Sequence, residues 1–551
     1  MNLGVLSGRL GRVGKVFGIA MLFTTLATFF YSFPRHTRDS AGGGFYHLNY
    51  DNKFTLSPSH LEGLDTPKIQ NATSQEKRLR VFMPADGPNI NLCKAIMSSV
   101  ALGYPLPTLL NWDGEFNRRG WHFGGSHIAK LESLLAVIEE LLTSSEDAHE
   151  DDLALMVDAY DIWFQLPPSA LIQRYHQLNR EADERNRRLW EASNALHADF
   201  PLDPPRQSII VTGAKDCQPG AESGSNPHYD LWPQSPMPVD LYGDQTDKFQ
   251  FAIFDSSHRF ARIRPRCVNS GMIMGTMGAM RAALRRAQVK VDDVARAGRQ
   301  LWSDQALLAE VQGDQEAWRA WTRELASTWN GSVATSPESI RHGHVNSIAA
   351  AALRGERFEF GIGLDYNFTT IPPTCSSEDD GGFVKFDDKP ALAVRSYQAG
   401  VRDRVRLTSL PPELDAALEL KEGPLAGLKW GLKPLYSDFF FGVTPVGIHH
   451  NAYKNSLKPW RLKHWWHRMW FYPMLRELIT YSLAVRKKGE RTLLEMEDGV
   501  KYVAPQEESV TVFKPGSQAV VEAIGWDGVC QKGSTPWYDE LLGDGQGTLV
   551  V

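Results

Sequence analysis

The chain has 551 residues, of which 42% are hydrophobic and 23% charged, and its formal net charge is −6. This composition is typical of a globular protein and excludes collagenous and low-complexity chains, while the length exceeds that of one ordinary domain. The negative balance offers no basic field for nucleic acid, which is therefore not expected as a partner.

An apolar, charge-free stretch at residues 16–33 follows Arg9, Arg12 and Lys15. A helix of this length, at about 1.5 Å per residue, spans roughly 27 Å, enough for a thin bilayer. A cleaved signal peptide is the competing interpretation, but the C-terminal end of the stretch is rich in bulky aromatic residues and lacks a small-residue cleavage pattern. The sequence predicts a cytosolic tail at 1–15, a single transmembrane anchor at 16–33, and a type II membrane protein whose body lies in the lumen of the endoplasmic reticulum or Golgi.

Residues 34–76 are polar and aperiodic, which predicts a stem between the membrane and the body. Glycosylation acceptor triplets at Asn71, Asn330 and Asn367 agree with a lumenal body. The 5 cysteines include no CxxC pair. They fit an oxidising compartment with at most two internal disulfides and one remaining thiol, and their spacing does not predict a structural zinc site.

From Leu79 onward, short apolar runs alternate with segments of helical periodicity, which predicts an α/β fold with a mostly parallel sheet. Strands are expected at 79–83, 107–111, 153–157, 208–212 and 268–274. Helices are expected at 127–142, 168–194, 277–287 and 306–311. The composition of 375–435 predicts an irregular insertion, and 476–551 form a C-terminal extension.

Asp158 and Asp161 directly follow the apolar run 153–157. Ligands of open α/β sheets collect at the carboxyl ends of the strands, so both carboxylates are expected in the binding crevice. Two acids three residues apart on a turning backbone can reach one divalent cation, which would clamp a diphosphate. The alternative is a turn in which Asp158 accepts backbone hydrogen bonds and Asp161 caps the next segment.

A second candidate ligand lies in the segment from Val446 to Asn451, where a short apolar run is followed by His449 and His450. A neutral imidazole is a competent metal ligand, although two surface histidines would give the same pattern. Two carboxylates and one imidazole, completed by diphosphate oxygens and water, suit Mn²⁺ better than zinc, with Mg²⁺ as the alternative. Ile448 continues a strand into His449, and the next side chain would point to the opposite side.

The strand candidate at 266–275 is interrupted by three small residues, Asn269, Ser270 and Gly271. Such residues let a ligand approach the backbone closely, but a β-bulge without a ligand fits the same spacing. Ser303 and Asp304 precede the helix predicted at 306–311 as N-terminal capping residues would, and Gln305 follows them. Asp304 and Gln305 could contact a polyol substrate or serve as a simple helix cap.

Tryptophans cluster at 460–470. Trp466 and Trp470 are four residues apart, as are Trp465 and Met469, so a helix that packs two faces explains them. Stacking on a sugar is the second interpretation.

Together these segments resemble the glycosyltransferase domain of collagen lysyl hydroxylases and related fungal type II membrane glycosyltransferases. The resemblance covers about 79–472 in patches. It rests on GGSHIAK (124–130), MVDAYDIWF (156–164), RPRCVNSGMIMG (264–275), SDQALLAE (303–310) and the His449 loop with the Trp-rich segment after it. It implies a GT-A fold over 77–475, in which a Rossmann-like sheet flanked by helices binds a nucleotide sugar through a divalent metal.

The resemblance also implies roles for single residues. The matching positions are Asp158, Asp161 and His449 as metal ligands, Tyr160 near the uracil, Asn269, Ser270 and Gly271 in the sugar pocket, Asp304 with Gln305 beside the transferred sugar, and Lys130 and Asn451 as donor contacts. Asp304 is the catalytic candidate.

The chain departs from the family after the histidine, where His450-Asn451-Ala452 replaces a glycine-containing loop and Lys454 lies one place off the register of the diphosphate-contacting lysine. His450 therefore stays the alternative ligand. Only the transferase half of the lysyl hydroxylases is implied, without their iron-dependent domain.

The sequence thus predicts a metal-dependent glycosyltransferase that moves a hexose from a UDP-sugar to an acceptor hydroxyl on a protein, a glycan or a small metabolite. A metal-dependent phosphoesterase is one alternative, because acids at strand ends also serve hydrolases, although such sites often hold two ions about 4 Å apart. A non-catalytic, membrane-anchored protein that binds a nucleotide sugar or carbohydrate is the other.

Overall fold

The structure is a computed structural model that describes residues 54–56, 61, 75–122, 124–217, 235–249, 259–330, 333–335, 343–399, 407–416, 423–454, 456–516 and 520–549. The predicted cytosolic tail at 1–15 and the predicted anchor at 16–33 lie outside the described residues, as does most of the predicted stem at 34–76. Within the described ranges, no helix is both long and apolar enough to cross a membrane.

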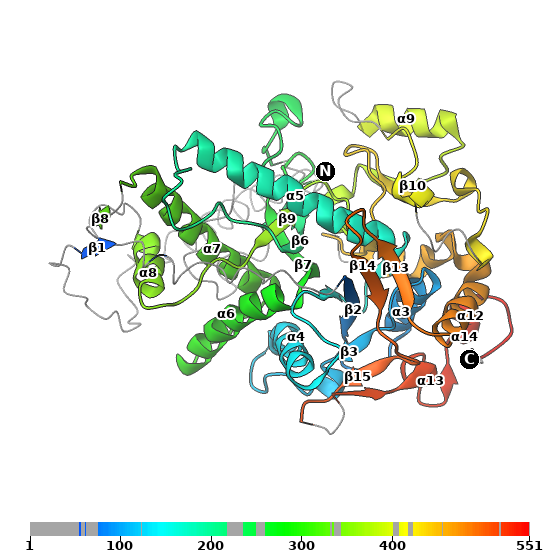
Figure 1. Ribbon diagram of the computed structural model, residues 1–551. Helices are drawn as coiled ribbons and strands as arrows, with labels where there is room; N and C mark the ends of the chain where they lie inside the picture. The colour runs from blue at the N-terminus through cyan, green and yellow to red at the C-terminus, as the bar shows by residue number, and fades with distance from the viewer. Residues whose placement is uncertain are drawn as a thin grey trace, which may run out of the picture. The chain divides into compact units, whose positions relative to one another are not determined.

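A mixed, mostly parallel sheet forms the centre of the fold (Figure 1). Its strands, in spatial order, are β16 (Val521–Ala523), β15 (Thr511–Phe513), β3 (Thr108–Leu110), β2 (Glu76–Pro84), β4 (Leu153–Val157), β7 (Cys267–Thr276), β6 (Ile209–Ala214) and β9 (Ile362–Asp365). β2 is parallel to β3 and β4, whereas β7 is antiparallel to both β4 and β6. The strands β13 (Arg491–Glu495) and β14 (Lys501–Ala504) form a hairpin that joins the sheet at β2, because β14 pairs with β2 in parallel.

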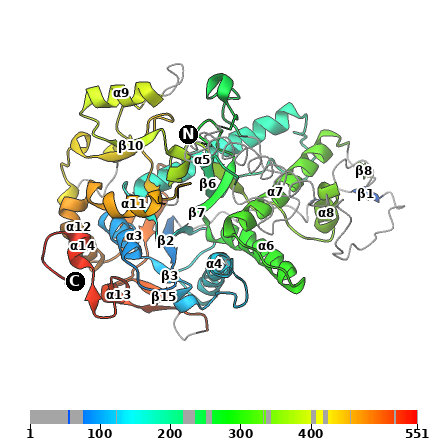
Figure 2. The same ribbon diagram turned by 180° about the vertical axis from the view of Figure 1, so that it is seen from behind.

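Helices cover both faces of this sheet, as its strand sequences require. Side chains alternate along a strand, so Leu153, Leu155 and Val157 of β4 enter one apolar cluster while Ala154 and Met156 enter the other. All five residues are buried, which explains why this strand is a continuous apolar run. The first cluster also takes residues of α3 (Ile90–Ala101), α5 (Pro168–Ala192) and α12 (Leu475–Arg486). The second takes residues of α4 (Gly125–Ser144), α6 (Met277–Arg296) and α7 (Asp304–Ser327), and Figure 2 shows α4, α6 and α7 on the opposite side of the strands from α3 and α12.

The predicted α/β alternation is confirmed for the strands and helices expected between residues 79 and 311. The strand predicted at 153–157 is β4 without a shift, and the helix predicted at 168–194 is α5, which ends at Ala192. α6 extends to Arg296, nine residues past its predicted end at 287, because Val291 continues the buried face of the helix. α7 is capped as predicted, since the Ser303 hydroxyl accepts a hydrogen bond from the Ala306 N–H at 3.2 Å.

The segment predicted as a C-terminal extension is part of the central architecture. β14 and β15 both pair with strands of the first half of the chain, at β2 and β3. A disulfide between Cys93 in α3 and Cys530 ties the same segment to the body. A second disulfide joins Cys217 to Cys267, and Cys375 is buried without a disulfide, in agreement with two bridges and one thiol.

Two small antiparallel sheets complete the part of the fold that carries the site. β5 (Ile162–Phe164) pairs with β12 (Gly447–His449), and β10 (Gly381–Val384) pairs with β11 (Leu435–Asp438). β10 and α9 (Lys389–Ala399) lie in the region predicted as an irregular insertion, which therefore has regular structure of its own. The Trp-rich segment is not one helix, because α11 (Leu457–His464) ends before two short 3₁₀ turns at 466–468 and 472–474.

Candidate metal centre

The connection between β4 and β5 carries the two predicted acids. The Asp158 N–H donates a hydrogen bond to the Gly271 carbonyl at 2.9 Å and so extends the β4–β7 pairing by one residue. Asp161 stands directly before β5, and its carbonyl accepts from the His450 N–H at 2.7 Å. Pairing of β5 with β12 then sets His449 opposite Ile162. The backbone ladder therefore places an imidazole beside both carboxylates.

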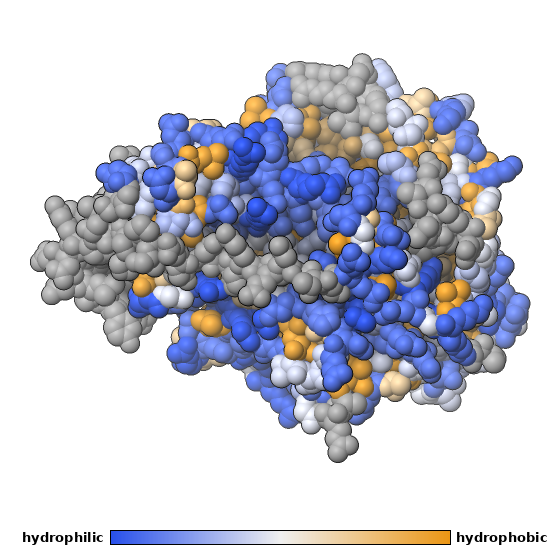
Figure 3. Space-filling view, viewed as in Figure 1, coloured by the Kyte–Doolittle hydropathy of each residue, from blue (hydrophilic) through white to orange (hydrophobic). Residues whose placement is uncertain are grey.

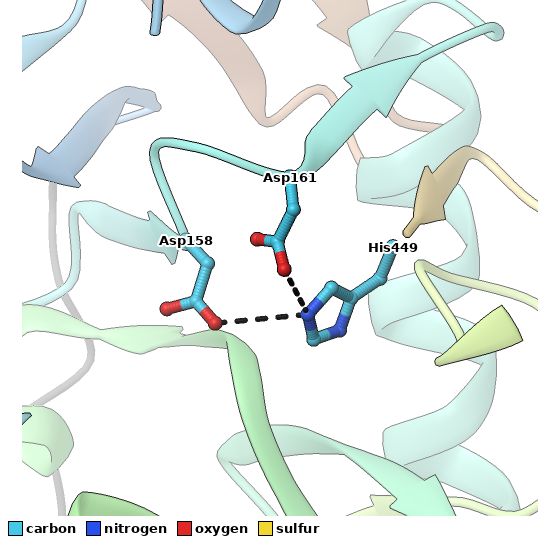
Figure 4. Close-up of side chains that lie close together, drawn as sticks. All are labelled: Asp158, Asp161 and His449. Carbon is cyan, nitrogen blue, oxygen red and sulfur yellow. Dashed lines mark ion pairs between the residues drawn. The ribbon is translucent and has the colours of Figure 1, made fainter. Parts of the chain in front are cut away.

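The three side chains converge from two separate parts of the chain (Figure 4). His449 Nε2 lies 3.3 Å from Asp161 Oδ2 and 3.7 Å from Asp158 Oδ2. One ligating atom from each residue lies within 4.8 Å of the others, a spacing that one ion could bridge. Asp161 and His449 are buried, whereas 31% of the Asp158 side chain is exposed, so the centre is open to a ligand on the Asp158 side.

Lys130, predicted as a donor contact, instead holds the carboxylates in place. Its Nζ atom, on α4, lies 2.6 Å from Asp158 Oδ1 and 2.7 Å from Asp304 Oδ2, and it donates to the Ser270 carbonyl at 2.8 Å. Burial alone would lower the pKa of Lys130, but the two carboxylates outweigh it and the net shift is upward. Three acceptors saturate the three ammonium protons, so none is left for a ligand.

The predicted interruption at Asn269, Ser270 and Gly271 is a break in strand register. Val211 of β6 is opposite Ile273, whereas the next residue, Thr212, is opposite Asn269. The extra residues bulge out of the ladder, and the Ser270 hydroxyl there donates to Asp304 Oδ2 at 2.8 Å. Burial raises the pKa of Asp304, but Lys130 and Ser270 outweigh it, so the pKa is lowered and the carboxylate is kept ionised.

Lys458 belongs to this centre although it was not among the predicted site residues. It lies in the first turn of α11, and its Nζ is 2.5 Å from Asp161 Oδ2. Burial would raise the pKa of Asp161, but His449 and Lys458 outweigh it and the net shift is downward. With 42% of its side chain exposed, Lys458 can also reach a ligand in solvent. Its position at the start of the helix that follows the histidine loop was the sequence signal that could have identified it.

His450 faces the other side of β12, as extended backbone requires. Its ring is fully buried, 4.0 Å between centroids from Trp163 and 5.7 Å from Trp465. Neither ring nitrogen has a hydrogen-bond partner, and burial lowers the pKa of His450 well below its ordinary value. Trp466 and Trp470 behind it are also buried, which agrees with core packing of the Trp-rich segment.

The side chains of the remaining predicted residues have partners other than the three ligand side chains. The Tyr160 hydroxyl donates to Asp86 Oδ1 at 2.5 Å. Asn269 Nδ2 donates to Gln305 Oε1 at 3.2 Å, so these two form a pair of their own. The side chain of Asn451 turns away toward Cys375, whose backbone N–H donates to Asn451 Oδ1 at 3.5 Å. The structure therefore does not support Asn451 as a contact at the centre.

Gly271 is where β7 passes under the His449 ring. A Cβ atom at this position would lie 2.2 Å from His449 Cε1 and 2.5 Å from Nδ1. G271A is therefore expected to displace the imidazole and, with Mn²⁺ as the predicted ion, to weaken its binding by about 10- to 100-fold, the scale of effects from residues that orient metal ligands. Calorimetric titration with Mn²⁺ measures this. G87A is the control, because a Cβ there has no atom within 4 Å, and equal affinities of the two variants would contradict the packing role.

Charge in the centre is nearly balanced. The three carboxylates of Asp158, Asp161 and Asp304 face the two ammonium groups of Lys130 and Lys458. One formal negative charge remains, which favours a cation. A bound divalent cation would change the net charge of the centre from negative to positive, with Lys458 beside the ion. The same centre would then attract an anion.

Comparisons with models of protein families and with curated proteins found no match for this chain. The chemistry of the centre is therefore inferred from its own residues. Within the described ranges, the two carboxylates and the imidazole are the one group of three acidic, histidine or cysteine side chains with metal-site spacing.

Proposed function

We propose that this protein is a metal-dependent glycosyltransferase that transfers a hexose from a UDP-sugar to an acceptor hydroxyl. The observation that carries the proposal is the convergence of Asp158, Asp161 and His449 at the carboxyl end of β4. This is the edge of an α/β sheet at which nucleotides bind. A GT-A type of sheet is part of the proposal, supported by the mixed strand order with helices on both faces.

The ligand set suits a hard or borderline divalent ion. Two carboxylate oxygens and one imidazole nitrogen would hold Mn²⁺ or Mg²⁺, with positions left for diphosphate oxygens and water. When bound, the ion would supply Lewis-acid stabilisation of the charge that develops on the departing diphosphate. Lys458 provides a second positive charge on the open side of the centre, where it can bind a phosphate oxygen.

Residues around the ligands orient the site. Lys130 fixes Asp158 and Asp304 in one geometry, and Ser270 fixes the second of these carboxylates from the bulge of β7. Asp304 is thereby held as an anion next to the centre, in a position to accept a hydrogen bond from a sugar hydroxyl. Preorganised groups of this kind cost no rearrangement when the donor binds.

The alternatives lack comparable support. A phosphoesterase with two ions about 4 Å apart needs more ligands than one group of three, and the described residues contain no second such group. A protein that only binds a nucleotide sugar would keep the same ligands, so turnover has to be measured. The two disulfides favour an oxidising compartment, which supports a lumenal body and the proposed membrane anchor in the secretory pathway.

A donor screen tests the proposal. The full chain is incubated with Mn²⁺ and a panel of UDP-hexoses, and release of UDP is measured with and without candidate acceptors. One UDP-hexose is expected to give UDP release that stops on chelation of the metal. Binding of UDP with no release from any donor would assign a binding protein, whereas release of phosphate from unrelated phosphomonoesters would assign a phosphoesterase.

A further inference from the structure

A groove of about 860 Å³ lies beside α9, outside the candidate metal centre. Its size is in the range of pockets that hold a drug-sized ligand or a few residues of extended chain. Apolar residues, drawn in orange and tan, gather next to α9 in Figure 3. Ten of the lining residues are apolar: Phe383, Val384, Pro390, Ala391, Val394, Leu432, Pro434, Met469, Trp470 and Pro473.

The charged residues of the groove are almost all basic. Lys385, Arg395, Lys433 and Arg468 line it, with Asp388 as the one acid, although the chain as a whole is acidic. Within the described part of the chain, none of these four cations forms an ion pair. Asp388 accepts a hydrogen bond from the Ala391 N–H at 3.1 Å and serves as the cap of α9.

Arg395 and Arg468 each lie over an aromatic ring. Arg468 lies over Phe383, 4.5 Å from the ring centroid, and Arg395 lies over Phe439 at 4.7 Å. Burial and then the charge of Arg395 lower the pKa of Arg468, which reflects two like charges without a counter-ion. Two like charges in one groove favour the binding of an anion.

The groove lies behind the metal centre. The Trp465 ring packs against Phe383 at 5.4 Å between centroids and against His450 at 5.7 Å. His450 is on the side of β12 opposite His449, so a layer of aromatic rings separates the groove from the metal ligands. A molecule in the groove would therefore leave the metal centre accessible.

We propose that this groove binds an acidic polypeptide segment of a partner protein, in which apolar residues alternate with Asp or Glu. The apolar floor requires apolar side chains, and the four cations require carboxylates. A glycan fits less well, because the lining offers one carboxylate to its many hydroxyl groups. This binding does not depend on the proposed transferase activity.

Fluorescence anisotropy tests the proposal with the full chain and a labelled ten-residue peptide of alternating Glu and Leu. Two comparison peptides carry Lys in place of Glu, or Ser in place of Leu. The Glu-Leu peptide is expected to bind at least tenfold more tightly than either, and saturating UDP with Mn²⁺ is expected not to displace it.

Variants locate the binding. R395E/R468E is expected to weaken binding of the Glu-Leu peptide at least tenfold, and V394S/L432S is expected to weaken it severalfold. Val394 and Leu432 are 56% and 52% exposed, so their replacement preserves folding. R187E/R188E, on the exposed face of α5, is the charge-matched control and should bind like wild type. Unchanged binding by R395E/R468E, or equal binding of the Ser peptide, would overturn the proposal. So would tighter binding of a sulfated oligosaccharide or of phosphatidylserine vesicles.

Discussion

Replacing Asp158 and Asp161 together by alanine is expected to lower kcat/KM for the proposed transfer from a UDP-sugar by about 10³-fold or more, roughly 4 kcal/mol. The double variant removes both carboxylates of the three-ligand group and leaves His449 as the one remaining ligand. It also frees Lys130 from one of its two carboxylates and Lys458 from its partner, which makes the centre positive in the absence of a metal. Metal affinity is thus lost together with the local preference for a cation.

The control is D199A/D203A, which changes the net charge by the same amount at exposed positions. Mn²⁺ affinity and UDP release are measured for both variants, and far-ultraviolet circular dichroism checks their folding. Wild-type rates in a folded D158A/D161A variant would refute the proposed site. Loss of metal binding with normal turnover would show that the reaction does not need the ion.

Replacing His449 by alanine is expected to weaken Mn²⁺ binding by 10- to 100-fold or more and to lower turnover in parallel. Its Nε2 atom points at both carboxylates from a buried ring, so the substitution removes one of the three ligands. His450 is expected to behave in the opposite way. H450F should leave Mn²⁺ affinity unchanged, because the ring faces Trp163 and Trp465 rather than the carboxylates.

The two histidines also differ in their expected effects on stability. H450F should not lower the free energy of unfolding, because it removes two buried nitrogen atoms that have no hydrogen-bond partner. H450A, the matched truncation, should cost about 2–4 kcal/mol through the cavity it leaves among the tryptophans. Metal titration and chemical unfolding of the three variants separate these roles. Equal losses of Mn²⁺ affinity in H449A and H450F would contradict the assignment of His449.

The local structure of the first half of the body could be predicted from the sequence because it depends on periodicity. β4 occupies the predicted residues 153–157, since a strand buried on both faces has to be a short, continuous apolar run. The cap of α7 at Ser303 followed from the side chain alone. The two acids after β4 could be found for the same reason, as they adjoin an element that the pattern defines.

The partners of those acids depended on tertiary structure. Lys458 reaches Asp161 across 297 residues of sequence, and no periodicity relates the two. The same holds for Lys130, whose three contacts turn a predicted ligand-binding residue into one that holds Asp158 and Asp304. The joining of β14 and β15 to the sheet was missed because short strands have weak patterns, and their neighbours are chosen by packing.

By itself the sequence determined which side chains have the chemistry to bind a metal, but it left His449 and His450 as alternative ligands. Only the tertiary structure decided that His449 meets the two carboxylates. The antiparallel pairing of β5 with β12 sets His449 beside Asp161, and the bulge in β7 leaves room for the ring at Gly271. Pairing between distant strands depends on the whole packed core, whereas strand and helix periods are local, and this is why the ligands could be predicted before their arrangement.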